Sequence, residues 1–190
     1  MSYQSLIYLV GPPGAGKTTI GRRLASALST TFIDTDERLA HSFGMPCGEI
    51  IRTRGLAEFR QAEAEVIRNT LAETGIVSLG GGAVETPAVR DMLREHTVVW
   101  LDVSPAEGVR RTSGDTNRPL LAADDPLARY IALRESRTPL YSDLCDMRVR
   151  TDQCSPQQAV AKILNWCEDH PDTHPPTTNP EALEHGETVF

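Results

Sequence analysis

Short apolar runs rich in β-branched residues alternate along this chain with longer segments in which apolar residues recur at helical spacing. The runs cover residues 5–10, 31–34, 75–79, 97–103 and 147–151. Between the second and third runs, residues 56–72 place Phe59, Ala62, Val66 and Leu71 on one face of a predicted helix. Such alternation predicts an α/β fold in three layers, with a central five-stranded parallel sheet flanked by helices.

The turn after the first run carries a phosphate-binding motif. Residues 11–19 read GPPGAGKTT, which fits the pattern G-x-x-x-x-G-K-[ST] at every fixed position. The preceding strand and a predicted helix over residues 18–29 supply the context that the motif requires. Glycines let successive N–H groups point at one anion, and the helix start adds its own N–H groups and positive dipole end. The predicted phosphate-binding residues are Gly14, Ala15, Gly16, Lys17, Thr18 and Thr19.

Two side chains of this loop have predicted roles of their own. Lys17 would bridge the β- and γ-phosphates of ATP, and the Thr18 hydroxyl would ligate Mg²⁺. The alternative is a glycine-rich turn that only connects a strand to a helix. Composition argues against that alternative, because only two of the 19 basic residues are lysine, Lys17 and Lys162. A compact ammonium suits a narrow phosphate cradle better than a planar guanidinium does.

Length and charge limit the class of protein. A chain of 190 residues suits a single domain, predicted over residues 1–169. The formal charge is -7, but without the six acidic residues from Glu168 onward 20 acidic and 19 basic residues remain. This balance gives no basic excess for nucleic-acid binding. Residues 170–190 contain four prolines and little apolar content, which predicts a disordered acidic tail.

Targeting signals and cysteine patterns are not evident. No apolar stretch approaches the ~20 residues of a membrane span, and the N-terminus lacks a signal-peptide pattern, so we expect a cytoplasmic protein without a membrane partner. The cysteines lack C-x-x-C spacing and are predicted to be free thiols. They are Cys47, Cys145, Cys154 and Cys167. His170 and His174 are interpreted as solvated, because Pro171 between them disfavours a helical metal site.

Polar residues and glycines follow the second and third runs. Asp34 and Asp36 are separated by one residue, so in an extended segment both side chains could point the same way. One carboxylate could then hold Mg²⁺ through water while the other orients or deprotonates an attacking hydroxyl. The alternative is that Asp36 caps a helix beginning at Glu37. Residues 80–82, all glycine, admit close approach of a substrate to the backbone or form an ordinary turn.

The order of these motifs with later ones resembles the shikimate kinase family. The resemblance runs from about Leu6 to Trp166 and includes GPPGAGKTT, Asp34-Thr35-Asp36, Glu58-Phe59-Arg60, SLGGGA at residues 78–83, Arg118-Pro119-Leu120-Leu121 and Arg137-Thr138-Pro139-Leu140-Tyr141. It implies a P-loop kinase fold like that of nucleoside-monophosphate kinases, with a mobile lid at about residues 112–125. It also implies ATP-dependent, magnesium-assisted phosphorylation of the 3-hydroxyl of shikimate by a monomeric enzyme of aromatic amino-acid biosynthesis. By local composition alone, the lid segment could be an ordinary surface connection.

The resemblance also implies roles for single residues. Asp36 would contact the acceptor hydroxyls as base or orienting group, within a substrate-binding segment at about residues 35–63. The other implied acceptor contacts come from Arg60 and Arg137, which hold the carboxylate, and from the glycine triplet, with Gly81 donating its amide and Gly82 beside it. A planar guanidinium suits a carboxylate independently of any family.

The remaining implied roles belong to the nucleotide, the metal and a bracing acid. Arg111 would lie near adenine, Arg118 would reach from the lid to the phosphates, and Asp34 would be the outer-shell magnesium residue. Glu63 would brace the arginine at the acceptor site. Lys17, Asp36 and Arg118 form the implied catalytic set.

One departure from the family pattern and two rival functions stay open. Relatives often place a basic residue where this chain has Cys154, which puts the adenine contact in doubt. A related sugar-acid kinase, such as gluconate kinase, also joins a phosphate loop to an acceptor that bears a carboxylate. A nucleotide-binding regulator without catalysis is the other rival, and the presence of Lys17, Thr18, Asp36 and Arg118 argues against it.

Overall fold

A single parallel sheet organises the chain. The computed structural model describes residues 5–113 and 125–171, and all structural statements refer to these. The strands are β1 (Leu6–Val10), β2 (Phe32–Asp34), β3 (Gly75–Ser78), β4 (Thr97–Asp102) and β5 (Met147–Arg150). Their order is β2-β3-β1-β4-β5 and every pairing is parallel. Each strand lies within a predicted run, so the predicted α/β fold with a five-stranded parallel sheet is confirmed.

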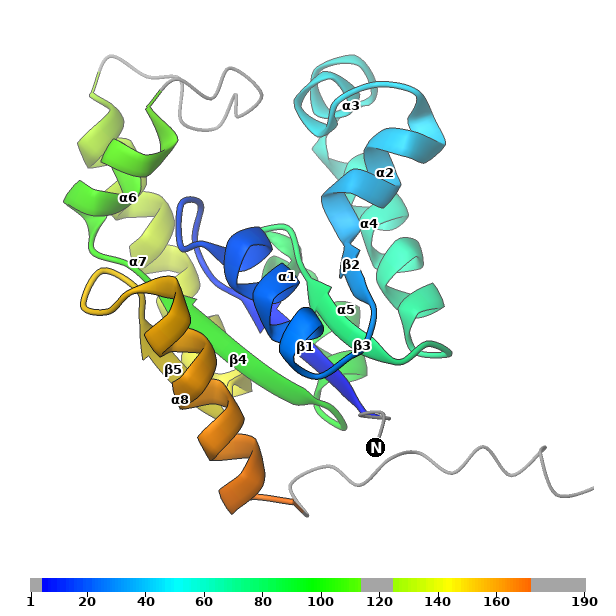
Figure 1. Cartoon of the computed structure of the whole chain (residues 1–190). Coiled ribbons are helices and arrows are strands. Elements are labelled where there is room, and N and C mark those ends of the chain that lie inside the picture. The colour runs from blue at the N-terminus through cyan, green and yellow to red at the C-terminus, as the bar shows by residue number, and fades with distance from the viewer. Residues whose placement is uncertain (1–4, 114–124, 172–190) are drawn as a thin grey trace, which may run out of the picture.

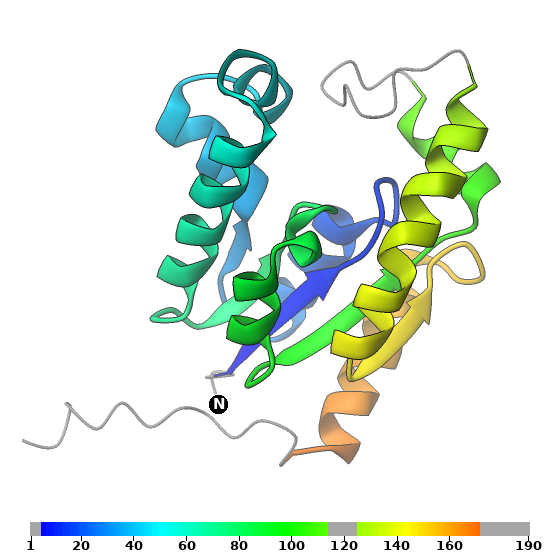
Figure 2. The same cartoon turned by 180° about the vertical axis from the view of Figure 1, so that it is seen from behind.

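Helices connect the strands and cover both faces of the sheet (Figure 1). They are α1 (Lys17–Ala27), α2 (Thr35–Phe43), α3 (Cys47–Arg54), α4 (Leu56–Thr70), α5 (Pro87–Leu93), α6 (Pro105–Thr112), α7 (Pro126–Leu144) and α8 (Pro156–Asp169), with a 3₁₀ turn η1 at Ala83–Glu85. Helices α1 and α8 lie on one face, while α5 and α7 lie on the face seen in Figure 2. The predicted helices over residues 18–29 and 56–72 correspond to α1 and α4.

The central strand shows why both faces are covered. Side chains alternate between faces along a strand, and every residue of β1 is buried. Tyr8 and Val10 belong to the core shared with α4, α5 and α7, whereas Ile7 and Leu9 belong to the core shared with α1 and α8. Polar side chains therefore gather at the carboxyl ends of the strands, where the loops emerge.

Two groups of helices rise beyond these carboxyl ends, on either side of the loop after β1 (Figure 1). Helices α2, α3 and α4 form one group and pack around a small core of Leu39, Ile50 and Phe59. Helices α6 and the start of α7 form the other group and pack against each other. The phosphate-binding motif thus lies between these two groups of helices.

Several expectations from the sequence concern the ends of the described ranges. Residues 114–124, with Arg118, and residues 172–190, with His174, lie outside the described residues. At Trp166 the indole ring stacks on His170 with centroids 4.6 Å apart, and His170 lies at the C-terminal cap of α8.

All four cysteines are free, as predicted. Within the described ranges, no helix has the length and apolar character needed to cross a membrane.

Candidate active site

The loop between β1 and α1 has the backbone of a phosphate cradle. Gly14 and Gly16 have φ values of 76° and 88°, a left-handed region that glycine adopts without strain. Gly16 also precedes α1 as its N-cap, and no side chain caps this helix start. The first N–H groups of α1 are therefore directed into the loop as donors for an anion. Lys17 Nζ donates to the carbonyls of Gly11 at 2.9 Å and Pro12 at 3.2 Å, which holds the ammonium across the loop.

Asp34 joins this loop to helix α2. Its Oδ2 accepts from Thr18 Oγ1 at 3.0 Å, and its Oδ1 accepts from the Asp36 amide at 3.1 Å and the Glu37 amide at 3.4 Å. The N-cap of α2 is therefore Asp34, and the helix begins at Thr35. The expectation of an extended segment carrying both aspartates is wrong, and so is the alternative of Asp36 as a cap before Glu37. Asp34 ends β2 in an extended conformation, which is the geometry that a capping aspartate needs.

Both aspartates nevertheless line the same cavity. A space of about 290 Å³ runs from the phosphate loop to the third strand and is lined by Gly14, Gly16, Lys17, Thr18, Thr19, Asp34, Asp36, Ser78, Leu79, Gly81 and Arg111. The Thr18 hydroxyl and the Asp34 carboxylate supply the hard oxygen atoms that Mg²⁺ prefers. No described cluster of three or more His, Cys, Asp or Glu residues could hold a metal alone. This donor set fits a magnesium ion that keeps its waters and is shared with nucleotide phosphates.

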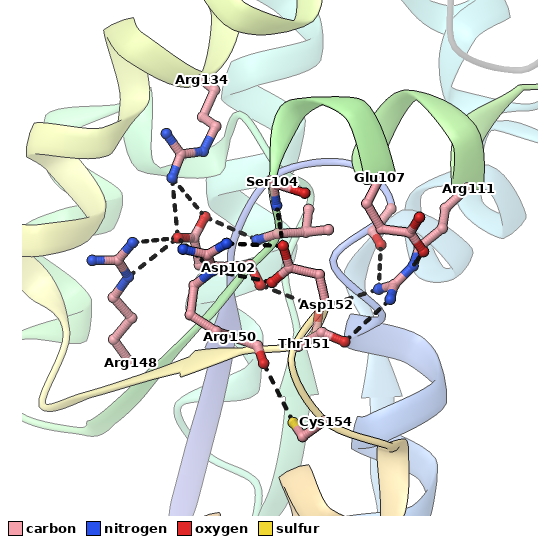
Figure 3. Close-up of polar contacts among 12 residues, drawn as sticks. Asp102, Ser104, Glu107, Arg111, Arg134, Arg148, Arg150, Thr151, Asp152 and Cys154 are labelled. Carbon is pink, nitrogen blue, oxygen red and sulfur yellow. Dashed lines mark hydrogen bonds and ion pairs between the residues drawn. The ribbon is translucent and has the colours of Figure 1, made fainter.

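Arg111 lies on the other side of the phosphate loop. It donates to the Gly14 carbonyl at 3.3 Å. It also donates to the Thr151 carbonyl at 3.1 Å and to Glu107 at 2.7 Å (Figure 3). A second cavity of about 310 Å³ is lined here by Gly14, Ala15, Gly16, Thr19, Ile20, Arg111, Thr151, Cys154, Ser155, Pro156 and Ala159. Cys154, the departure from the family pattern noted in the sequence, is therefore among the residues that line this cavity, where the resemblance implies that adenine binds. Its thiol donates to the Arg150 carbonyl at 3.3 Å.

A buried aspartate that the sequence did not single out supports this second cavity. Asp102, at the end of β4, is fully buried and accepts hydrogen bonds from Arg134 and Arg148 (Figure 3). Its main-chain carbonyl accepts from the Thr151 amide at 2.8 Å. Nearby, hydrogen bonds from Arg150 lower the pKa of Asp152 well below its usual range. The cluster fixes the loop after β5, which carries Thr151 and Cys154.

Asp36 and Glu63 face each other across Gly80 on the opposite side of the phosphate loop. A Cβ atom built on Gly80 would lie 2.6 Å from Glu63 Oε1 and 2.8 Å from Asp36 Oδ1, so a side chain there would displace both carboxylates. Glu63 is 1% exposed, and burial raises its pKa to about 7 although Arg60 opposes the shift and Asp36 adds to it. Buried Thr35, which belongs to the motif Asp34-Thr35-Asp36 but has no predicted role, fixes this corner by accepting from the Gly80 amide at 3.3 Å.

Arg60 and Arg137 come together although they are far apart in sequence. A Cβ on Gly82 would lie 1.9 Å from Arg60 Nη2 and 2.9 Å from Arg137 Nη2, so both guanidiniums lie against this glycine. Arg60 donates to Glu63 Oε2 at 2.7 Å and to Glu85 Oε2 at 2.6 Å. Arg137 Nε donates to Glu85 Oε1 at 2.9 Å. Glu85 belongs to no recognised motif, so no sequence signal pointed to it.

Helix α7 contributes one side chain to each part of the site from a single face. Tyr130 donates its hydroxyl to the Pro13 carbonyl at 2.7 Å in the phosphate loop. One turn further, Arg134 reaches Asp102, and the next turn carries Arg137. Tyr141 then donates to the Gly81 carbonyl at 2.5 Å. These tyrosines hold the phosphate loop and the glycine triplet against the same helix.

The described residues with predicted roles are thus gathered along one edge of the sheet. A phosphate loop after the central strand, with carboxylates on one side and a second cavity on the other, is the arrangement of a P-loop kinase. The shikimate kinase family model matches residues 13–168 of the chain. This chain belongs to the shikimate kinase family.

Relatives and solved structures agree with that assignment. The chain is 54% identical over 164 residues to a shikimate kinase of Corynebacterium efficiens, covering 86% of this chain and 97% of the relative. It is 50% identical over 158 residues to a shikimate kinase of Mycobacterium avium, covering 83% and 90%. A solved shikimate kinase from Acinetobacter baumannii in complex with shikimate superposes with a TM-score of 0.84 at 33% identity, covering 87% and 94%. A deoxyadenosine kinase from M. mycoides shares the fold alone, with a TM-score of 0.59 at 12% identity.

Proposed function

We propose that this chain transfers the γ-phosphoryl group of ATP to the 3-hydroxyl of shikimate, which yields 3-phosphoshikimate and ADP. The observation that carries the proposal is that Asp36 lines the cavity beside the phosphate loop, while Arg60 and Arg137 lie together against Gly82, next to the Gly81 of that cavity. Shikimate has the matching polarity, with hydroxyls at one end and a carboxylate at the other. Membership of the shikimate kinase family supports the same substrate.

In the proposed reaction the backbone of the phosphate loop and Lys17 bind the β- and γ-phosphates. The acceptor oxygen forms a bond to the γ-phosphorus, and the bond from that phosphorus to the β,γ-bridging oxygen breaks. The proton of the acceptor hydroxyl passes to Asp36, which the first turn of α2 aims into the cavity. ADP is the leaving group. Most of the catalysis is then positioning and charge stabilisation, as is usual in phosphoryl transfer.

The other proposed roles follow the geometry of each region. Thr18, and Asp34 through water, would hold Mg²⁺, which when bound neutralises charge on the phosphates. Arg111 would contact adenine from its position between the two cavities. The amides of Gly81 and Gly82 would meet the acceptor ring, and Glu63 would orient Arg60. Arg118 lies outside the described residues, and its proposed contact with the phosphates rests on the family motif alone.

The wider proposal follows the family as well. It includes a monomeric, cytoplasmic enzyme that serves aromatic amino-acid biosynthesis, with one kinase domain over residues 1–169. Analytical ultracentrifugation of the full chain tests the monomer.

One turnover experiment tests the reaction against its rivals. The purified full chain is incubated with ATP and Mg²⁺, and ADP release is measured with shikimate, with gluconate or with neither. We expect release with shikimate only, with 3-phosphoshikimate identified by ³¹P NMR and mass spectrometry. Turnover with gluconate instead would favour the sugar-acid kinase. ATP binding without turnover on either acceptor would favour the non-catalytic regulator.

A further inference from the structure

Glu85 makes contacts that resemble those of a bound carboxylate ligand. It closes the 3₁₀ turn η1, three residues after Gly82, and each of its oxygens accepts from a different guanidinium. Oε2 lies 2.6 Å from Arg60 Nη2, and Oε1 lies 2.9 Å from Arg137 Nε. Desolvation raises the pKa of Glu85, but its hydrogen bonds and charge interactions with Arg137 and Arg60 outweigh this and lower the pKa below the ordinary value. The group is therefore an ionised carboxylate that bridges the two arginines.

The arginine pair already has carboxyl partners within this chain. Arg60 and Arg137 supply two positive charges, and Glu63 and Glu85 supply two carboxylates that hydrogen-bond to them. An acceptor carboxylate would add a negative charge beside the ionised Glu85. Like charges that share a site disfavour one another by several kcal/mol at short range. An acceptor carboxylate that binds both guanidiniums therefore competes with these glutamates for the arginine N–H groups.

Burial decides which glutamate can leave. The Glu63 side chain is 1% exposed, so it cannot move into solvent. It also lies three residues after Arg60 on the same helix, which keeps the two side chains together. The Glu85 side chain is 37% exposed, while those of Arg60 and Arg137 are 16% and 4% exposed. Glu85 is thus the outermost member of the cluster and can rotate into solvent, where its charge is hydrated at low cost.

We propose that Glu85 is an internal competitor for the acceptor carboxylate, displaced from Arg60 and Arg137 when the acceptor binds. This inference rests on the proposed function for the identity of the acceptor. Its consequence is a fixed penalty on every ligand that binds this pair through a carboxylate, because each must displace the same group. A ligand whose only polar group is a carboxylate makes the same hydrogen bonds to Arg60 and Arg137 that Glu85 already makes, so it gains little. An acceptor whose hydroxyls also reach Asp36 gains a second set of contacts.

The variant Glu85→Gln tests the inference, since it keeps the shape of the side chain and removes its charge. We expect KM for shikimate to fall by about tenfold, while KM for ATP stays unchanged. A tenfold change is expected if Glu85 occupies the arginine pair in about nine of ten protein molecules without acceptor. The inhibition constant of cyclohexanecarboxylate, a carboxylate ring without hydroxyls, should fall by the same factor. Its uncharged methyl ester should show no gain. Glu85→Asp, one methylene shorter, should give intermediate values because it reaches only one guanidinium.

A matched control comes from α4. Glu65→Gln removes an exposed carboxylate that pairs with Arg68 away from the site, and it should leave every constant unchanged. A rise of KM for shikimate in Glu85→Gln would make Glu85 a positioning residue, and an unchanged KM would make its contacts irrelevant; either result overturns the inference. Failure of the proposed function is seen separately, as absent turnover of shikimate by the unaltered chain. In that case calorimetric binding of cyclohexanecarboxylate to both proteins still decides the role of Glu85.

Discussion

The nucleotide side of this site uses backbone groups, whereas the acceptor side uses charged side chains. The phosphate loop binds through backbone N–H groups, fixed by left-handed glycines and the start of α1. The acceptor side uses Asp36 of α2 and charged side chains of α4, η1 and α7 that pair with one another. A site made of contiguous backbone keeps its shape when a neighbour changes, whereas a side-chain cluster rearranges. Substitutions on the two sides should therefore have different effects on kcat, KM and stability.

Lys17→Met should have the largest effect. The ammonium is the point charge that crosses the phosphate loop, and methionine keeps the length of the side chain without the charge. We expect loss of kcat of about 10³-fold or more, in the range for removing a preorganised charge stabiliser, with an unchanged melting temperature. Lys162→Met on α8 is the matched control and should be silent. Normal turnover by a folded Lys17→Met protein would show that backbone donors suffice.

Asp36→Asn should follow, with kcat lower by roughly 10²-fold, the usual range for a positioned acid–base group. ATP affinity should barely change, because the phosphate contacts come from the loop. Asp34, and not Asp36, caps α2, so the helix should keep its stability. Steady-state kinetics and thermal melting of the variant separate these effects. A fall in melting temperature with normal kcat would reverse the assignment and give Asp36 a structural role.

Glu63 should make stability depend on pH. Its folded pKa of about 7 lies above the ordinary 4.5, so the folded state favours the protonated form. This contribution is complete below about pH 4.5 and is lost as pH rises through about 7, a change of about 3 kcal/mol. Glu63→Gln stays neutral at every pH and should lack this component. Urea unfolding of both proteins from pH 5 to 8 measures the difference, and parallel profiles would show that Arg60 keeps Glu63 ionised throughout.

Gly82→Ala should have the smallest effect and be confined to the acceptor. The added methyl would meet the ends of two arginine side chains, which can shift without disturbing the backbone. KM for shikimate should rise by about tenfold, which corresponds to about 1.4 kcal/mol, while KM for ATP is unchanged. Gly81→Ala meets its neighbours at 3.3 Å or more and should change KM less. Equal effects of the two substitutions would contradict the geometry at Gly82.

The difference between the two sides also explains what could be predicted from sequence. The phosphate loop is nine contiguous residues, and the strands are continuous apolar runs, so local pattern was sufficient for both. Asp34 and Asp36 do line the cavity beside the phosphate loop, but the extended conformation predicted for both is wrong, because the capping bond that starts α2 at Thr35 ends the extended segment. Glu85 contacts arginines 25 and 52 residues away, and no local pattern encodes such a meeting.

Helix α7 also bears on how such chains tolerate insertions. Its contacts to the phosphate loop, Asp102, Glu85 and the glycine triplet start from positions 130, 134, 137 and 141, which share one face of a helix. One residue inserted after Tyr130 would rotate all later positions by about 100°. Three of the four contacts would then be lost together, on both sides of the site. Length variation should therefore be absent from this helix and be confined to positions outside it.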